Sequence, residues 1–361
     1  LSIFKPIRSF LPVQFIIKKF FIIFLFIVFL SISNNSYSSS KNVEDFGIIT
    51  LMYHRFEENK YPSTNIRVKD FVKQIEMIKN ENIYFINPKN FLSDLKEKKK
   101  IRKLLITIDD GFLSFYNNAW PILKKNKIPF ILFVSTREVG NYGYMNWEQI
   151  QEISNYPFVE IGNHSHSHEY LVDEELAVIK KDLLTSKELF KKKLKKNSIF
   201  FSYPFGEYSL KFKTLVEELD FKFAFGQHSG VVGNSSNSYE LPRFPINEKY
   251  GELKRFATLL KTIPFSYLSI QPEEKYINDT SNPPKVKIKF SKKTENLRSI
   301  NCFSNEEDKW QNSQINFLKN NEIEIKLSGK FITERGRINC SLRQENGFYK
   351  WLGVQFVIAE K

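Results

Sequence analysis

The sequence is poor in cysteine and histidine, with two cysteines and five histidines in 361 residues. A chain of this length can bury a large core without cross-links, so two cysteines exclude a small disulfide scaffold. Hydrophobic residues make up 42% and charged residues 26%, a balance that excludes an intrinsically disordered chain. We find no internal repeat, and the length predicts two or three domains.

Charge is unbalanced: Lys+Arg number 54 and Asp+Glu 40, a formal net charge of +14. An excess of this size suggests nucleic acid or an anionic surface as a partner. The lysines, however, are spread along the chain beside many Ile, Asn and Phe residues, which indicates a compositional bias. We therefore predict no nucleic-acid partner.

Only one hydrophobic run is long, and it lies near the N-terminus. Lys18 and Lys19 precede the run from Phe20 to Ile32, in which Ser31 is the single non-apolar residue, and residues 33–40 are polar. A transmembrane span needs about 20 apolar residues, so the pattern favours a secretory signal. We predict that residues 1–40 are a signal peptide or an N-terminal membrane anchor.

The anchor alternative rests on the apolar residues before Lys18, which would let residues 15–32 act as a membrane tether. In both cases we expect an exported protein, periplasmic or extracellular, with attachment to the inner membrane as the alternative. That compartment is oxidising, so Cys302 and Cys340 either form a disulfide or stay as two buried thiols.

Short apolar runs alternate with amphipathic stretches over residues 41–270. The predicted strands are Ile48–Tyr53, Leu104–Ile108, Phe130–Val134, Phe158–Ile161, Ile199–Tyr203 and Phe221–Phe225. The predicted helices are Val68–Lys79, Asn118–Lys125, Glu174–Leu194 and Leu210–Leu219. This alternation predicts an α/β fold with a parallel sheet or barrel, whose chemistry lies at the carboxyl ends of the strands.

The pattern changes near residue 270. Residues 271–284 are polar and contain prolines, as expected of a linker, and residues 285–361 alternate in short runs typical of a small β-rich domain. The role of this C-terminal domain is left open, with glycan binding as a hypothesis. Its aromatic residues would form either a platform for sugar rings or part of the core. They are Trp310, Trp351, Tyr349 and Phe348.

Two motifs at predicted strand ends suggest a metal site. The run Thr107-Ile108-Asp109-Asp110-Gly111 places adjacent carboxylates after one strand, where a cation would keep both ionised. The run from Asn163 to His168 holds three of the five histidines. Imidazole suits zinc and neighbouring divalent ions, whereas a polar loop is the alternative interpretation.

A third motif, Tyr203-Pro204-Phe205-Gly206, follows the strand that begins at Ile199. Proline and glycine favour a tight turn, which presents backbone N–H groups at the same edge of the sheet. Taken alone, this is a common loop.

In this order, the three motifs resemble those of the polysaccharide deacetylase family, over roughly residues 48–245. Leu51-Met52-Tyr53-His54 resembles the branch that deacetylates poly-β-1,6-N-acetylglucosamine. The resemblance implies a distorted, incomplete (β/α) barrel. It implies one divalent metal ion held by Asp110, His164 and His168, with Zn²⁺ favoured. It also implies Asp109 as catalytic base, His54 as general acid, and the backbone N–H of Tyr203 in an oxyanion hole.

Two departures from the family pattern affect these assignments. Ser202 stands where many members carry an arginine that pairs with the catalytic aspartate, and Arg243 either supplies that partner or forms an unrelated ion pair. The late histidine motif is missing, and His228 is the only late histidine, so we favour His54 as the acid. His166 is expected to point away from the metal.

The sequence thus predicts a metal-dependent hydrolase that removes N-acetyl groups from amino-sugar units of an exported or cell-envelope polysaccharide and releases acetate. One alternative is a polysaccharide O-acetyl esterase. Another is an inactive glycan-binding protein on the same fold, although the complete Asp109, Asp110, His164 and His168 set argues against it.

Overall fold

The structure, a computed structural model, describes residues 45–97, 101–292 and 294–359. The predicted signal or anchor segment lies outside these residues. Within the described ranges, no helix combines the length and the apolar character needed to cross a membrane.

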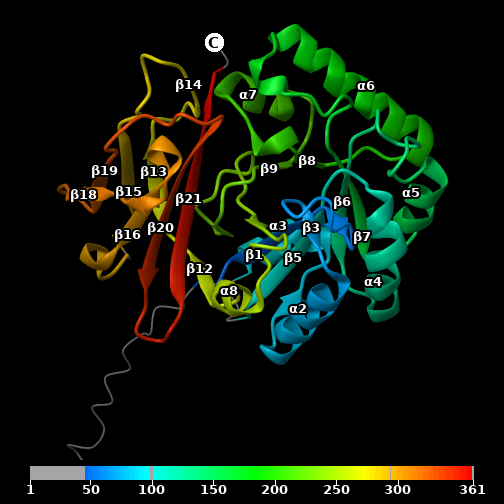
Figure 1. Cartoon of the computed structure of the whole chain (residues 1–361), viewed down its shortest axis with the longest axis horizontal. Coiled ribbons are helices and arrows are strands. Elements are labelled where there is room, and N and C mark those ends of the chain that lie inside the picture. The colour runs from blue at the N-terminus through cyan, green and yellow to red at the C-terminus, as the bar shows by residue number, and fades with distance from the viewer. Residues whose placement is uncertain (1–44, 98–100, 293, 360–361) are drawn as a thin grey trace, which may run out of the picture. The chain divides into compact units, whose positions relative to one another are not determined.

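A curled, mainly parallel sheet forms the N-terminal part of the fold (Figure 1). Its neighbouring strands, in spatial order, are β10 (Val231–Val232), β1 (Ile48–Tyr53), β5 (Lys103–Ile108), β6 (Phe130–Val134), β7 (Val159–Asn163), β8 (Phe200–Ser202) and β9 (Phe223–Phe225). All are parallel except β10, which runs antiparallel to β1. The predicted strands over β1 and β6 have the observed bounds, because their continuous apolar runs suit strands buried on both faces.

Residues 241–245 close the curl. Leu241 pairs with Phe225 at the end of β9, and β11 (Phe244–Pro245) pairs with the carboxyl-terminal half of β1. One short segment therefore links the two ends of the curled sheet near the carboxyl ends of its strands. The predicted distorted, incomplete (β/α) barrel is confirmed.

Alternation along the strands separates two cores. Leu105, Ile131 and Phe133 belong to a cluster on the inner face, whereas Ile106 and Leu132 pack outward against the helices. The surrounding helices are α2 (Val68–Asn80), α4 (Trp120–Asn126), α5 (Trp147–Ser154), α6 (Leu176–Leu194) and α7 (Leu210–Glu218) (Figure 1). Because side chains alternate with a period of two, Thr107 shares the face of Leu105, and Asp109 follows at the inner rim.

Several short elements were not predicted because two to eight residues carry little periodic signal. They are β2 (Arg55–Phe56), β3 (Asn65–Ile66), β4 (Tyr84–Phe85), α3 (Phe91–Lys96), α5 and α8 (Leu253–Leu259). The predicted helix near residue 118 is α4 preceded by a π-helical turn, Phe115–Ala119.

Two β-sheets form the C-terminal part. One contains β12 (Thr262–Pro264), β21 (Tyr349–Ile358), β20 (Arg335–Arg343), β16 (Asn301–Ser304), β17 (Gln311–Asn312) and β14 (Tyr276–Ile277). The other contains β13 (Tyr267–Gln271), β15 (Val286–Phe290), β19 (Glu322–Lys326) and β18 (Gln314–Phe317). A shared apolar cluster lies between them, which confirms the predicted all-β part. β12 and β14 both pair with β21, so two strands that precede residue 285 also belong to the first of these sheets.

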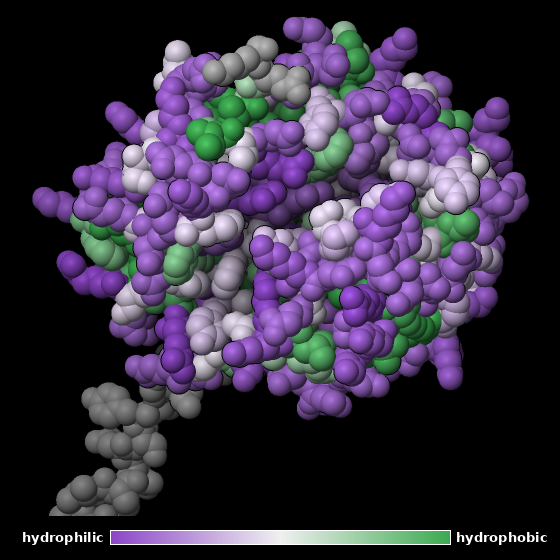
Figure 2. Space-filling model, in the orientation of Figure 1, coloured by the Kyte–Doolittle hydropathy of each residue, from purple (hydrophilic) through white to green (hydrophobic). Residues whose placement is uncertain are grey.

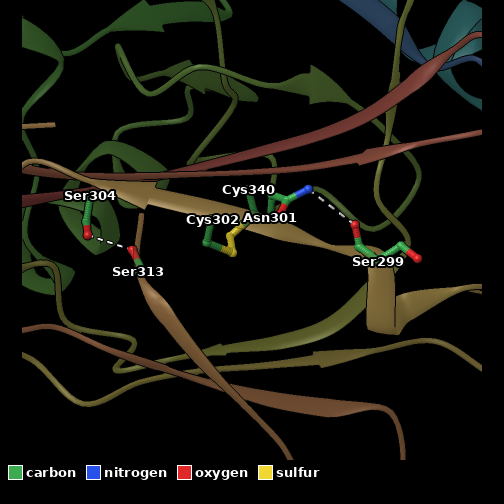
Figure 3. Close-up of a disulfide and its surroundings, with 6 residues drawn as sticks. All are labelled: Ser299, Asn301, Cys302, Ser304, Ser313 and Cys340. Carbon is green, nitrogen blue, oxygen red and sulfur yellow. Dashed lines mark hydrogen bonds between the residues drawn. A yellow bond between two sulfur atoms is a disulfide. The ribbon is translucent and has the colours of Figure 1, made fainter. Parts of the chain in front are cut away.

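A disulfide joins the two cysteines that the sequence left open. Cys302 on β16 and Cys340 on β20 lie directly opposite each other in the antiparallel register, and their sulfur atoms are bonded (Figure 3). Both are buried in the C-terminal core.

The molecular face in Figure 2 is mainly hydrophilic, with hydrophobic side chains in small separate patches.

Candidate metal and catalytic site

A sharp turn after β5 separates the two adjacent carboxylates. Asp109 donates its N–H to Tyr53 O at 2.8 Å, and the next two residues take positive φ angles, 72° at Asp110 and 80° at Gly111. A positive φ at a non-glycine residue is strained and is often found at functional sites. The Asp109 side chain is fully buried, whereas that of Asp110 is 13% exposed.

Asp110 meets two imidazoles from the loop after β7. Its Oδ1 lies 3.3 Å from His164 Nε2 and 3.2 Å from His168 Nε2. One ligand atom from each of the three residues lies within 4.8 Å of the other two. The structure thus brings together the three predicted ligands, while His166 lies outside this cluster and bonds Thr136 Oγ1 through Nδ1 at 2.8 Å.

The donor set fits a divalent metal ion. His164 Nδ1 lies 2.7 Å from Ser202 O, and because a carbonyl only accepts, Nδ1 must carry a hydrogen. In neutral His164 the lone pair of Nε2 then faces the Asp110 carboxylate, an arrangement that a cation between them would stabilise. An oxygen and two imidazole nitrogens are ligands that Zn²⁺ accepts, and three protein ligands leave a position open.

Helix α6 holds the histidine loop, a contribution that sequence reasoning missed. Asp182 accepts the N–H groups of His166 and Ser167 at 2.7 and 2.9 Å. Ser165 Oγ accepts the N–H of His168 at 3.0 Å. Asp182 lies one turn from the buried Ile179 on the predicted helix. Its partners are backbone amides of a loop, and no sequence pattern predicts that they need an acceptor.

Arg243 binds Asp109 through two parallel hydrogen bonds. Nη1 donates to Oδ1 at 2.7 Å and Nη2 to Oδ2 at 2.8 Å, and both side chains are fully buried. The guanidinium also donates to Ser202 Oγ, Thr107 Oγ1 and Gly226 O at 2.8, 3.1 and 2.9 Å. Arg243 therefore reaches the aspartate from the segment that closes the barrel, past the small side chain of Ser202.

Both carboxylates are held in the ionised form. Burial alone would raise the pKa of Asp109, but the Arg243 guanidinium and nearby imidazoles outweigh it and lower the pKa below its usual value. For Asp110, burial is likewise outweighed by the adjacent imidazoles of His164 and His168, and its pKa lies well below the usual value. Asp109 is thus available as a proton acceptor.

His54 and His228 lie in different electrostatic surroundings. Burial lowers the pKa of His54, and the carboxylates of Asp110 and Asp109 act against it. Burial lowers the pKa of His228 to about 4, where Glu240 is the opposing charge. His54 therefore titrates under the influence of the Asp110 cluster, whereas His228 responds to a group away from it.

The third motif presents a different residue from the one predicted. The N–H of Tyr203 donates to Phe225 O at 3.1 Å within the sheet, and its buried hydroxyl donates to Tyr239 O at 3.1 Å. The predicted oxyanion donor is therefore engaged and is not free for a ligand. Phe205, two residues after Tyr203 in the turn, has a φ of 57°. Its ring packs edge-on against that of His168, with ring centroids 4.8 Å apart.

A cavity of about 760 Å³ opens over the cluster. Asp110, His168, His54 and Phe205 border it, so the metal cluster and the candidate acid face the same space. Its volume lies within the range of small-molecule and sugar sites.

A curled parallel sheet with an Asp-His-His cluster and a buried aspartate at its strand ends is an arrangement suited to a metal-dependent hydrolase, and comparisons with known proteins point to the same class. Residues 96–224 match the family described as polysaccharide deacetylase. This part of the chain is therefore similar to a family of enzymes.

Relatives and solved structures are similar to the same part of the chain, the structures in fold. A poly-β-1,6-N-acetyl-D-glucosamine N-deacetylase of Staphylococcus aureus is 28% identical over 213 residues, which are 55% of this chain and 73% of the relative. IcaB from Ammonifex degensii shares the fold with a TM-score of 0.54 and 23% identity, over 60% of this chain and 98% of that chain. The Streptococcus pyogenes deacetylase PplD has a TM-score of 0.53 and 23% identity, over 59% of this chain and 99% of its own.

We predict that Arg243→Met lowers the free energy of unfolding by about 3–5 kcal/mol, because it leaves the Asp109 charge buried without a partner. Asp109→Asn/Arg243→Met should be more stable than Arg243→Met alone, since both charges are then removed. Denaturant unfolding of the two variants measures this, and equal stabilities would contradict the pairing.

We predict that stability falls on acidification through His228. Its folded pKa is about 4 and the unfolded value about 6.5, so the unfolded state binds the proton first. The loss begins below about pH 6.5 and reaches up to about 3 kcal/mol near pH 4. His228→Gln should flatten the pH dependence of unfolding in this window, whereas the control His166→Gln should retain it.

We predict that Asp182→Asn weakens metal binding by roughly 10- to 100-fold, because the loop carrying His164 and His168 loses two charge-assisted hydrogen bonds. Titration of the metal-free protein with Zn²⁺ measures the affinity directly. The control is Asp173→Asn. Asp173 lies just before the same helix and accepts a hydrogen bond from the Tyr276 hydroxyl. Unchanged affinity in Asp182→Asn would show that the loop is held by other contacts.

Proposed function

We propose that the chain removes N-acetyl groups from amino-sugar units of a polysaccharide and releases acetate. The observation that carries the proposal is the fully buried Asp109 directly before Asp110 of the Asp110–His164–His168 cluster, of which Asp110 and His168 border one cavity. Amide hydrolysis needs such a base next to an electrophilic centre. Sequence similarity to the N-deacetylase of Staphylococcus aureus supports an N-acetylglucosamine polymer as substrate.

Asp110, His164 and His168 would hold one divalent ion, and Zn²⁺ is the metal we favour for this donor set. When bound, this ion supplies a Lewis acid for the N-acetyl carbonyl and lowers the pKa of a neighbouring water. Asp109 takes the proton of the attacking water as the new C–O bond forms. Arg243 acts as a positioning residue, because its two hydrogen bonds fix the orientation of Asp109 and keep it ionised.

His54 protonates the amine as the C–N bond breaks, which leaves acetate and a free amino sugar. A lowered pKa makes the protonated imidazole a stronger acid, and its place on the cavity wall beside Asp110 lets it reach the leaving group. Phe205 is the better oxyanion donor than Tyr203. It borders the cavity, and no acceptor for its N–H is present among the described residues.

Export of the protein is part of the proposal. The Cys302–Cys340 disulfide supports an oxidising compartment, since disulfides rarely persist in the cytosol. The basic and apolar N-terminal pattern supports the same route by sequence alone. We therefore place the reaction in the periplasm or outside the cell.

Acetate release from β-1,6-linked N-acetylglucosamine oligomers tests the proposal. We predict release that a chelator abolishes and added Zn²⁺ restores, with Asp109→Asn lowering kcat by about 10²- to 10⁴-fold while Zn²⁺ still binds. His166→Gln is the control and should keep wild-type rates. Release that survives both chelation and Asp109→Asn would overturn the mechanism, and release only from O-acetylated xylan would identify an esterase.

A further inference from the structure

The C-terminal sheet forms a second wall of the cavity over the metal cluster. Residues from this wall lie on three neighbouring strands and on the turn before β17. They are Phe303, Trp310, Arg335, Arg337, Asn339, Trp351 and Val354. The match to the deacetylase family ends at residue 224, so this wall lies outside it.

Strand alternation explains which side chains the wall presents. On β20, the buried residues Gly336, Ile338 and Cys340 alternate with half-buried ones. Of the half-buried residues, Arg335 and Arg337 border the cavity. The buried set packs into the core between the two sheets. The β20 face that points away from that core therefore carries two arginines toward the substrate space.

The charges on the cavity wall do not cancel. Arg335 pairs with the buried Glu207 at 2.5 Å, but no carboxylate lies within ion-pair distance of Arg337 among the described residues. Arg337 donates instead to the neutral Gln355 Oε1 at 3.3 Å. On the opposite wall Arg255 and Lys249 add two more cations, and Arg255 donates to a backbone carbonyl, that of Tyr250.

The two walls converge near Tyr250. The guanidinium carbon of Arg255 lies 5.1 Å from the centre of the Tyr250 ring. Burial, followed by the nearby Arg335 charge, lowers the pKa of Arg337, and Tyr250 acts electrostatically on both Arg255 and Arg337. Two half-buried guanidinium groups from different parts of the fold thus face one volume without a direct ion pair among the described residues, and the carboxylate of Glu207, which pairs with Arg335, acts on Arg337 only from further away.

This volume continues to the metal cluster through Phe205. The ring of Phe205 lies 4.8 Å from that of His168 on one side, and 5.7 Å from the guanidinium carbon of Arg335 on the other. Asp110, itself a candidate metal ligand, is the only carboxylate among the described residues that border the cavity. A glycan bound at the metal cluster would therefore place neighbouring units beside Arg337 and Arg255.

We propose that Arg337 and Arg255, which border the cavity from two different parts of the fold, form a subsite for an anionic group, carboxylate or phosphate, on a sugar unit next to the one that is deacetylated. This inference rests on the proposed function and adds the substrate class: an N-acetylated polysaccharide that carries acidic units or substituents. A guanidinium binds either group through paired hydrogen bonds, which is why arginine suits this role better than lysine.

Aromatic side chains beside the arginines fit sugar rings. Trp310 and Phe303 border the cavity and are 49% and 41% exposed. The indole N–H of Trp351, whose side chain also borders the cavity, is buried and has no hydrogen-bond partner among the described residues. The sequence hypothesis of an aromatic platform thus finds Trp310 and Trp351 at the cavity, whereas Phe348 packs against Phe46.

The test compares three oligomers on the full chain: neutral N-acetylglucosamine oligomers, oligomers that alternate N-acetylglucosamine with a uronic acid, and N-acetylglucosamine oligomers bearing a 6-phosphate. Calorimetric affinity and kcat/KM for acetate release are both measured. We expect at least one anionic oligomer to bind about tenfold more tightly than the neutral one at low salt, with the advantage shrinking at 0.5 M NaCl.

Arg337→Gln should lower the ratio of anionic to neutral affinity about tenfold. Arg343→Gln, on the same strand but outside the cavity, should keep the wild-type ratio. The uronate and phosphate arms identify which anion is bound. Equal affinities of all three oligomers, or equal ratios in the two variants, would overturn the subsite. Tighter anionic binding with no acetate release from any oligomer would support the subsite and overturn the proposed function.

Discussion

The ion pair between Asp109 and Arg243 is the interaction on which the fold and the site both depend. Arg243 lies on residues 241–245, which join β9 to β1 and close the curled sheet. Asp109 directly follows β5 on the inner rim, one residue before Asp110 of the candidate metal cluster. The same two hydrogen bonds therefore hold the closing segment in place and keep the candidate base ionised and oriented. A buried charge pair of this kind adds little net stability, but it fixes one arrangement because breaking it is costly.

Sequence reasoning reached the parts of the fold that depend on local pattern. Strands such as β1 and β6 were predicted with their observed bounds because their apolar runs are continuous, and α2 followed from its periodic buried face. The cluster of Asp110, His164 and His168 was predicted from the resemblance to the polysaccharide deacetylase family. It forms because parallel strands end at one edge of the sheet, where motifs far apart in sequence meet. The interpretation of Arg243 stayed open because its partner lies 134 residues away and only the closing segment brings them together.

Other features depend on hydrogen-bond partners that no pattern encodes. The N–H of Tyr203 was expected at the site, but the register of β8 and β9 commits it to Phe225 O. Asp182 and the disulfide partners were missed or left open for the same reason: each depends on which loop or strand lies opposite. The arginine wall was also hidden, because Arg335 and Arg337 resemble any solvated strand face until β20 is placed beside the cavity.

Under the proposed function, the positive charge around the cavity affects how tightly the product is bound. N-deacetylation turns a neutral amide into an amine that is protonated near neutral pH, so the product gains positive charge in a cavity bordered by Arg255, Arg337 and Lys249. Like charges in a partly buried space repel, which weakens product binding relative to substrate binding. An acidic neighbouring unit would counter this repulsion for the incoming chain, while a deacetylated neighbour would add to it. Under the proposed subsite, the arginines would favour glycans in which acidic units flank the acetylated one and would disfavour repeated reaction on adjacent amino sugars.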